Sequence, residues 1–113
     1  MVLLSNNIRN GIFEHGIINR ENEKIFAYEV NGFGDYRLMD DANLPSLLSL
    51  PYLSFLPEND PIYQKTREYL LSTRNPYFYG SGSISGIGSS HTNREYIWPL
   101  ALMTQILTSQ SDE

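Results

Sequence analysis

The sequence contains no cysteine. This absence excludes disulfide-stapled folds, thiolate zinc sites, iron–sulfur clusters and cysteine nucleophiles. It carries no information about the compartment, because a chain without cysteine is compatible with any redox environment. The two histidines, His15 and His91, lie far apart and do not have the spacing of metal ligands. We therefore predict neither a metal site nor a cofactor.

Basic residues are few and scattered: there are 8 against 13 acidic residues, for a formal net charge of −5. Nucleic-acid binding usually shows as a basic stripe or run, and none occurs. No apolar stretch approaches the roughly 18–20 residues of a membrane span. The sequence therefore favours neither a nucleic-acid partner nor a membrane span, and it leaves the localisation unknown.

Common catalytic signatures are also missing. The four glycines at positions 80, 82, 86 and 88 do not complete a G-x-G-x-x-G nucleotide fingerprint, and no G-K-Ser/Thr phosphate loop occurs. There is no G-x-S-x-G nucleophile elbow either. Nucleotide binding and the commonest kind of serine hydrolase are therefore not indicated.

What is present is enough for one small domain: 113 residues, 41% of them hydrophobic and 19% charged. We expect helices over about residues 2–18, from about residue 43 to Pro51, over 60–74 and over 96–107, with a short strand over 24–30. Asp60-Pro61 is the clearest helix start, an N-cap followed by proline. The helix at 96–107 is apolar nearly all round, so it must be buried on every face.

Both ends of the chain have the pattern of an interrupted helix. The first helix has no capping residue ahead of it, and residues 109–113 resemble the N-cap and acidic first turn of another helix. The chain also offers little to cover the apolar helix at 96–107. We therefore expect residues 1–113 to be an interior fragment of a larger domain.

A stretch rich in glycine and serine, residues 80–90, contains 4 Gly and 5 Ser. This composition is typical of a flexible linker. Aromatic-rich sequence on both sides favours a functional loop instead.

Polar residues in apolar surroundings are the candidates for a site. Asp40, Asp41 and Asn43 form the densest such cluster, and a carboxylate pair can grip a polyol or act as acid and base. Helix capping is the alternative explanation. His91, after the glycine-rich stretch, is either a ligand-binding imidazole or a loop residue bonded to the backbone. Aromatic rings near it, including Trp98, suit a sugar ring or ordinary core packing.

Three segments carry a resemblance to a known family: YEVNGFGDYRLMDDANLPSLLSLPYL at 28–53, NPYFYGSG at 75–82 and GIGSSHTNREYIWPLALMTQILTS at 86–109. They resemble glycoside hydrolase family 125, the metal-independent exo-α-mannosidases. The resemblance implies an (α/α)6 barrel and inverting hydrolysis of terminal α-1,6-linked mannose. It also implies an α-mannoside glycan as partner.

The resemblance implies site residues as well. The family's general acid lies upstream of the DDAN motif and its general base downstream, in a His-Glu-Ser-Phe segment; this chain contains neither, so we assign no catalytic residue. The remaining polar and aromatic positions are expected to form a wall of the sugar subsite. They are Asp40, Asp41, Asn43, His91, Thr92 and Trp98.

Together these expectations describe an all-α fragment. It would be part of an (α/α)6 barrel, with three to four helices, long connecting loops and at most a short β-hairpin. We expect the isolated chain to be inactive. The alternatives are a non-catalytic sugar-binding or interaction protein derived from the family, and a partial gene model without independent function.

Overall fold

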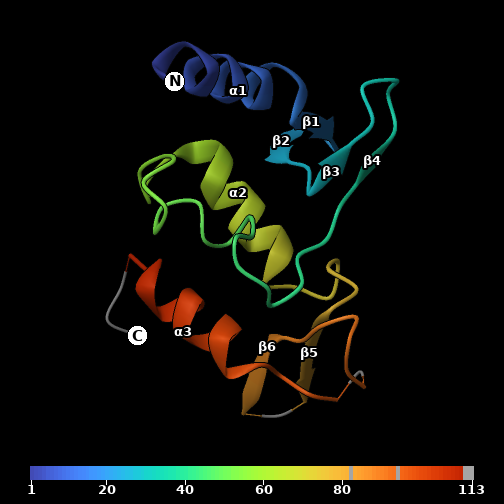
Figure 1. Cartoon of the computed structure of the whole chain (residues 1–113). Coiled ribbons are helices and arrows are strands. Elements are labelled where there is room, and N and C mark those ends of the chain that lie inside the picture. The colour runs from blue at the N-terminus through green and yellow to red at the C-terminus, as the bar shows by residue number, and fades with distance from the viewer. Residues whose placement is uncertain (82, 94, 111–113) are drawn as a thin grey trace.

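The computed structural model describes residues 1–81, 83–93 and 95–110. Within these ranges, three helices are separated along the chain by groups of short strands (Figure 1). The elements are α1 Val2–His15, β1 Ile17–Arg20, β2 Glu23–Phe26, β3 Glu29–Val30, β4 Tyr36–Arg37, α2 Pro61–Leu70, β5 Phe78–Ser81, β6 Ile84–Ile87 and α3 Pro99–Leu107. In Figure 1, α2 lies in the middle, with α1 and β1–β2 on one side and α3 and β5–β6 on the other. Of residues 109–113, which were expected to begin a further helix, residues 111–113 lie outside the described residues.

The prediction of an all-α fold with at most one short hairpin is wrong. The described chain contains three antiparallel two-stranded sheets, β1–β2, β3–β4 and β5–β6, beside its three helices. A partial (α/α)6 barrel is not evident in it. Turn chemistry explains the first hairpin, because Glu21 and Asn22 reverse the chain with φ of 53° and 67°. Gly32 and Gly34, with φ of 76° and 102°, serve the second.

The stretch expected to be a functional loop forms most of the third hairpin. Its residues 80–81 are the end of β5, and its residues 84–87 are β6, which pairs with β5. Gly88 follows directly, and a Cβ there would lie 2.5 Å from the Tyr96 carbonyl oxygen and 2.7 Å from the Tyr79 ring. Glycine is required at this position because two other segments approach the backbone too closely for a side chain.

We expect Gly88→Ala to destabilise the chain by about 1–3 kcal/mol, since backbone or ring must shift to admit the methyl group. Gly11→Ala is the matched control. Gly11 lies within α1, and a Cβ there meets nothing within 4 Å. That change should stabilise the chain by roughly 0.5–1 kcal/mol. Urea unfolding of both variants measures the difference, and equal midpoints would contradict the tight contact at Gly88.

The helix start at Asp60-Pro61 is confirmed. The Asp60 carboxylate accepts hydrogen bonds from the N–H groups of Ile62 and Tyr63, each at 2.9 Å, and α2 begins at Pro61. The helix ends at Leu70, earlier than the predicted end at residue 74. The two expected elements around it, a helix after residue 2 and extended structure within 24–30, also form, as α1 and as β2 and β3.

The helix predicted to begin near residue 43 does not form. Residues 44–56 are bends and turns, with a cis peptide bond between Leu44 and Pro45. Side-chain oxygens accept hydrogen bonds from backbone N–H groups that would bond to backbone carbonyls in a helix. Ser49 Oγ accepts from the Ser46 N–H at 2.8 Å, and Asp40 Oδ2 accepts from the Leu48 N–H at 2.8 Å. Such local side-chain acceptors compete with helical hydrogen bonding.

Two clusters of buried side chains hold the elements together around α2. The first contains Leu48, Leu70, Ile87 and Ala101 among others, and it joins the C-terminal part of α2 to β6 and α3. The second is formed by Phe26, Leu56 and Tyr63 between β2 and α2. On this frame lie the segments that follow β4 and β6, in which the candidate site residues occur.

The apolar helix α3 is not buried on every face within the described chain. Only Ala101 and Thr104 are buried in it. Met103 and Ile106 are 58% and 72% exposed. The sequence-based requirement of all-round burial for this helix is therefore not met by the described residues.

Candidate functional site

The candidate residues come from two segments that meet at Gly88. One segment, residues 38–43, follows β4, and the other, residues 88–92, follows β6. The Ala42 N–H donates to the Gly88 carbonyl at 3.1 Å, which joins the two. The Gly88 N–H in turn donates to the Tyr77 carbonyl at 2.8 Å. Residues far apart in the sequence are thus fixed side by side.

Asp41 is the centre of a small polar network. Asp41 is only 5% exposed, and both of its carboxylate oxygens accept hydrogen bonds. Asn43 Nδ2 donates to Oδ2 at 2.9 Å, and the Tyr28 hydroxyl donates to Oδ1 over a long 3.5 Å. Burial, followed by the charges of Asp41 and Asp40, raises the pKa of Tyr28, so that this phenol keeps its proton and remains a donor. The network holds the Asp41 carboxylate in one orientation.

Asp40 points into the protein. The residue is 1% exposed, and its Oδ2 accepts from the Leu48 N–H. Its Oδ1 is buried without a hydrogen-bond partner among the described residues. Burial raises the pKa of Asp40 to about 7, against the opposing effect of the hydrogen bonds from Leu48 and Asp41. The neighbouring aspartates therefore have different surroundings.

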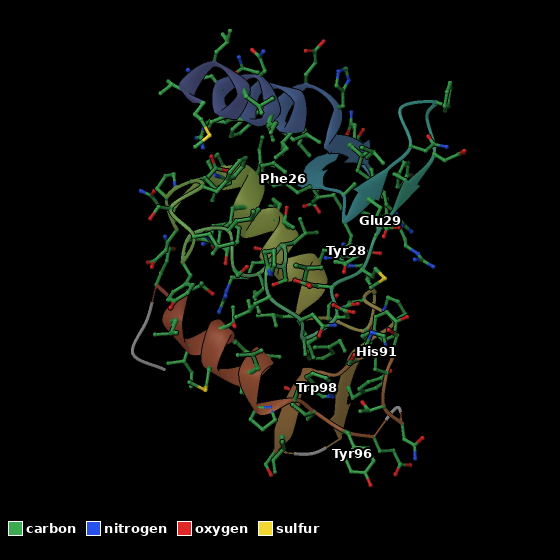
Figure 2. All side chains as sticks on the ribbon, viewed as in Figure 1. Phe26, Tyr28, Glu29, His91, Tyr96 and Trp98 are labelled. Carbon is green, nitrogen blue, oxygen red and sulfur yellow. The ribbon has the colours of Figure 1, made fainter. Side chains whose placement is uncertain are left out.

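The second segment contains His91 and Thr92, and Trp98 lies just ahead of α3. The His91 backbone N–H donates to Ser89 Oγ at 3.2 Å, while the residue itself is exposed. Thr92 Oγ1 accepts from Trp98 Nε1 at 3.0 Å, which fixes the indole ring against this loop. The Trp98 N–H donates to the Ile87 carbonyl at 3.1 Å. Figure 2 shows His91 and Tyr28 on the same side of the molecule, with Trp98 nearer its middle.

A groove of about 390 Å³ lies next to this network. It is lined by Tyr28, Glu29, Pro45, Ser46, Leu47, Leu50 and Leu53. Tyr28 belongs to both the groove and the Asp41 network. The volume of the groove is within the range of pockets that bind small ligands, and its lining combines apolar surface with a few polar groups.

Sequence reasoning missed three residues that support the candidate set. Tyr28 donates to Asp41, Ser89 bonds the backbone at His91, and Asn75 bonds the backbone of Asp40. Asn75 had a signal of its own, because it precedes a proline, but that pattern predicts only a helix end. Tyr28 and Ser89 gave no signal apart from their place in the resembling segments. The tertiary fold brings them into the site.

No group of three or more His, Asp or Glu side chains that could hold a metal ion occurs among residues 1–81, 83–93 and 95–110. In those ranges, no helix has the length and apolar character needed to cross a bilayer.

Comparisons with known proteins agree on one family. The family described as metal-independent alpha-mannosidase (GH125) matches residues 1–113. The meiotically up-regulated gene 157 protein of Schizosaccharomyces pombe is 48% identical over 111 residues, which are 96% of this chain and 22% of that protein. A Streptococcus pneumoniae metal-independent alpha mannosidase, solved as a non-productive complex with alpha-1,6-mannobiose, is similar with a TM-score of 0.90 and 47% identity. That match covers 96% of this chain and 26% of the pneumococcal chain.

The match over all 113 residues defines a glycosidase family, and this chain belongs to glycoside hydrolase family 125, the metal-independent α-mannosidases. The chain spans about a quarter of the length of the two relatives.

Proposed function

We propose that this chain forms part of an inverting exo-α-1,6-mannosidase and supplies one wall of its sugar-binding subsite. The observation that carries the proposal is the likeness, at 47% identity and a TM-score of 0.90, to a mannosidase bound to alpha-1,6-mannobiose. The polar and aromatic groups around Gly88 support it. An α-mannoside is therefore the proposed ligand.

The Asp41 network has the chemistry that a sugar hydroxyl needs. Each carboxylate oxygen offers more than one acceptor position. Oδ1 accepts from the Tyr28 hydroxyl and from the Asn43 N–H, whereas Oδ2 accepts from Asn43 Nδ2 and keeps a position for a further donor. A mannose hydroxyl can donate to what remains. Bonds from sugar hydroxyls to such groups strengthen as charge develops in the transition state. Asp41 and Asn43 are thus proposed to bind the sugar directly.

The loop of His91 and Trp98 is proposed to form a second contact. The exposed imidazole of His91 can donate to or accept from a hydroxyl. Trp98 offers an apolar ring held in place by Thr92, and aromatic faces suit the C–H face of a pyranose. Thr92 contributes by fixing the indole, and its own hydroxyl is already used twice, by Trp98 Nε1 and by the Ser89 carbonyl.

Asp40 and Asp41 are not proposed as the catalytic acid and base. An inverting glycosidase keeps its two carboxyl groups roughly 6.5–9.5 Å apart, on opposite sides of the scissile bond, with a water between. Asp40 is buried with its carboxylate against Leu48, so it cannot face the same substrate as Asp41. We therefore assign no acid–base pair within these 113 positions. The isolated chain is expected to release no mannose.

The test compares two proteins on α-1,6-mannobiose. One is the isolated 113-residue chain, and the other is the longer mannosidase of which this chain is proposed to form part, called here the full-length protein. The proposal is supported if the full-length protein releases mannose and if NMR detects the inverted anomer as the first product. Mannose release by the isolated chain would contradict the expectation that the catalytic acid and base lie outside these 113 residues. Calorimetric binding of the mannobiose by the full-length protein without any turnover would favour the alternative, a non-catalytic sugar-binding protein.

We expect Asp41→Asn, in the full-length protein, to lower kcat/KM on α-1,6-mannobiose by about 10- to 100-fold, because hydrogen bonds to a charged group are each worth about 1.5–3 kcal/mol. Glu14→Gln is the matched control. It removes a carboxylate charge from the exposed side of α1 and should leave kcat/KM within about twofold. Unchanged kinetics for Asp41→Asn would remove Asp41 from the proposed subsite.

A further inference from the structure

The backbone of Asp40 is held by the side chain of Asn75, a residue that follows α2. Asn75 Oδ1 accepts from the Asp40 N–H at 3.3 Å, and Asn75 Nδ2 donates to the Asp40 carbonyl at 3.1 Å. The same Nδ2 donates to the Leu70 carbonyl at 3.1 Å, at the end of α2. Asp40 and Asn75 are each 1% exposed. Asp40 therefore has a fixed position relative to α2.

The carboxylate of Asp40 closes the turn that follows it. Oδ2 accepts from the Leu48 N–H at 2.8 Å, eight residues further along the chain. Leu48 is held from its other side, because its carbonyl accepts from the Tyr63 hydroxyl at 2.8 Å. Residues 40–48 are thus a closed loop anchored on α2 at both ends.

Uncharged groups surround the other side of this carboxyl. A cavity of about 10 Å³ is lined by Asp40, Ala42, Ser46, Leu48, Ile87, Ala101 and Thr104. Space of this size has room for about one water molecule. The charge of Asp41 raises the pKa of Asp40, and the charge of Asp40 raises the pKa of Tyr28. None of the ion pairs in the described part of the chain involves Asp40.

The site lies directly on this anchor. Asp41 is the next residue, and Ala42 is bonded to Gly88 at 3.1 Å. The direction of the Asp41 carboxylate is set by the backbone on both sides of it. We propose that Asp40 is a positioning residue, whose buried carboxyl holds the 40–48 loop so that Asp41 and Asn43 face the sugar. This inference rests on the proposed function, and it gives Asp40 a role through Asp41 in place of direct contact with the ligand.

The experiment compares two substitutions in the full-length protein, assayed on α-1,6-mannobiose. Asp40→Leu removes the acceptor for Leu48 and should lower kcat/KM at least about tenfold, since misplacement by about 1 Å is costly for a binding group. Asp40→Asn keeps an amide oxygen for Leu48 and should retain kcat/KM within about threefold at pH 5.5. Thr104→Val, which changes another residue that lines the same cavity, is the control and should leave kcat/KM unchanged.

The pH profile separates positioning from mere packing. An ionised carboxylate accepts a stronger hydrogen bond from Leu48 than an amide does. The ratio of kcat/KM for Asp40→Asn to that of the wild type should therefore fall by about threefold between pH 5.5 and pH 8, as the wild-type Asp40 ionises. A ratio that is constant across this range would overturn the inference.

Crystal structures of the two variants decide the inference independently of turnover. We expect the Asp41 carboxylate to move by about 1 Å or more in Asp40→Leu and to keep its place in Asp40→Asn. An unmoved Asp41 in a folded Asp40→Leu protein would overturn the positioning role. Absence of mannose release by the wild type would count against the proposed function alone.

Discussion

Tyr63→Ala is expected to destabilise the chain by about 3–5 kcal/mol, the usual cost of removing a buried aromatic ring. Tyr63 is 0% exposed and lies in the cluster that joins β2 to α2. Its hydroxyl also donates to the Leu48 carbonyl at 2.8 Å. The substitution therefore removes core packing and one anchor of the 40–48 loop together. Urea unfolding followed by the fluorescence of Trp98, the one tryptophan of the sequence, measures the loss.

Two further variants divide this effect into its parts. Tyr63→Phe keeps the ring and leaves the Leu48 carbonyl unpaired, so it should lose about 1–3 kcal/mol. Tyr52→Ala removes a similar side chain that is 59% exposed and should stay within about 0.5 kcal/mol of the wild type. If Tyr63→Ala unfolds at the same urea concentration as Tyr52→Ala, then Tyr63 does not anchor the loop.

Features with a local cause were the ones that the sequence predicted well. Asp60 caps α2 through its own side chain, and the cap, the proline and the first turn lie within four residues. The helix at the start of the chain and the extended segment near Phe26 follow from spacing of the same short range. For such elements the sequence contains the whole physical reason, because the interacting groups are neighbours in the chain.

The failed predictions depend on partners distant in sequence. The segment after Asn43 has the composition of a helix start, but Asp40 takes the Leu48 amide and Tyr63 takes the Leu48 carbonyl. Neither interaction can be inferred from the spacing of residues 43–51. The turns of the first two hairpins have a local cause in Glu21, Asn22, Gly32 and Gly34, but the resemblance to a helical family favours an all-α fold. Family architecture describes a whole domain, and this chain spans about a quarter of its relatives.

The candidate site divides in the same way. The sequence pattern and the resemblance both indicate Asp41 and His91, while their support by Tyr28 and Ser89 depends on how the two segments fold together. Resemblance also treated the adjacent aspartates alike. Their surroundings distinguish them, since Asp41 is bonded by polar side chains and Asp40 faces a small, uncharged cavity. The difference between the two is a property of packing, and it has a consequence for stability.

Asp40 should make the chain less stable as the pH rises from about 4 to about 7. The folded state holds the Asp40 proton up to a pKa of about 7, whereas the unfolded chain releases it near the ordinary value of 3.8. Between these values the folded state binds more protons than the unfolded state, so the free energy of unfolding falls with pH and levels off above 7. At 1.36 kcal/mol per pKa unit, the difference amounts to about 4 kcal/mol.

Asp40→Asn removes this titration and isolates it from those of the other carboxylates. Relative to the wild type, we expect the variant to gain up to about 4 kcal/mol in free energy of unfolding between pH 4 and pH 8, measured by urea unfolding at a series of pH values. Thr104→Val is the control, because it changes the same cavity without removing a titratable group, and its difference from the wild type should not change with pH. A flat difference for Asp40→Asn would mean that the buried carboxyl is ionised throughout. In that case its charge must be stabilised by a group that the cavity admits, such as one bound water.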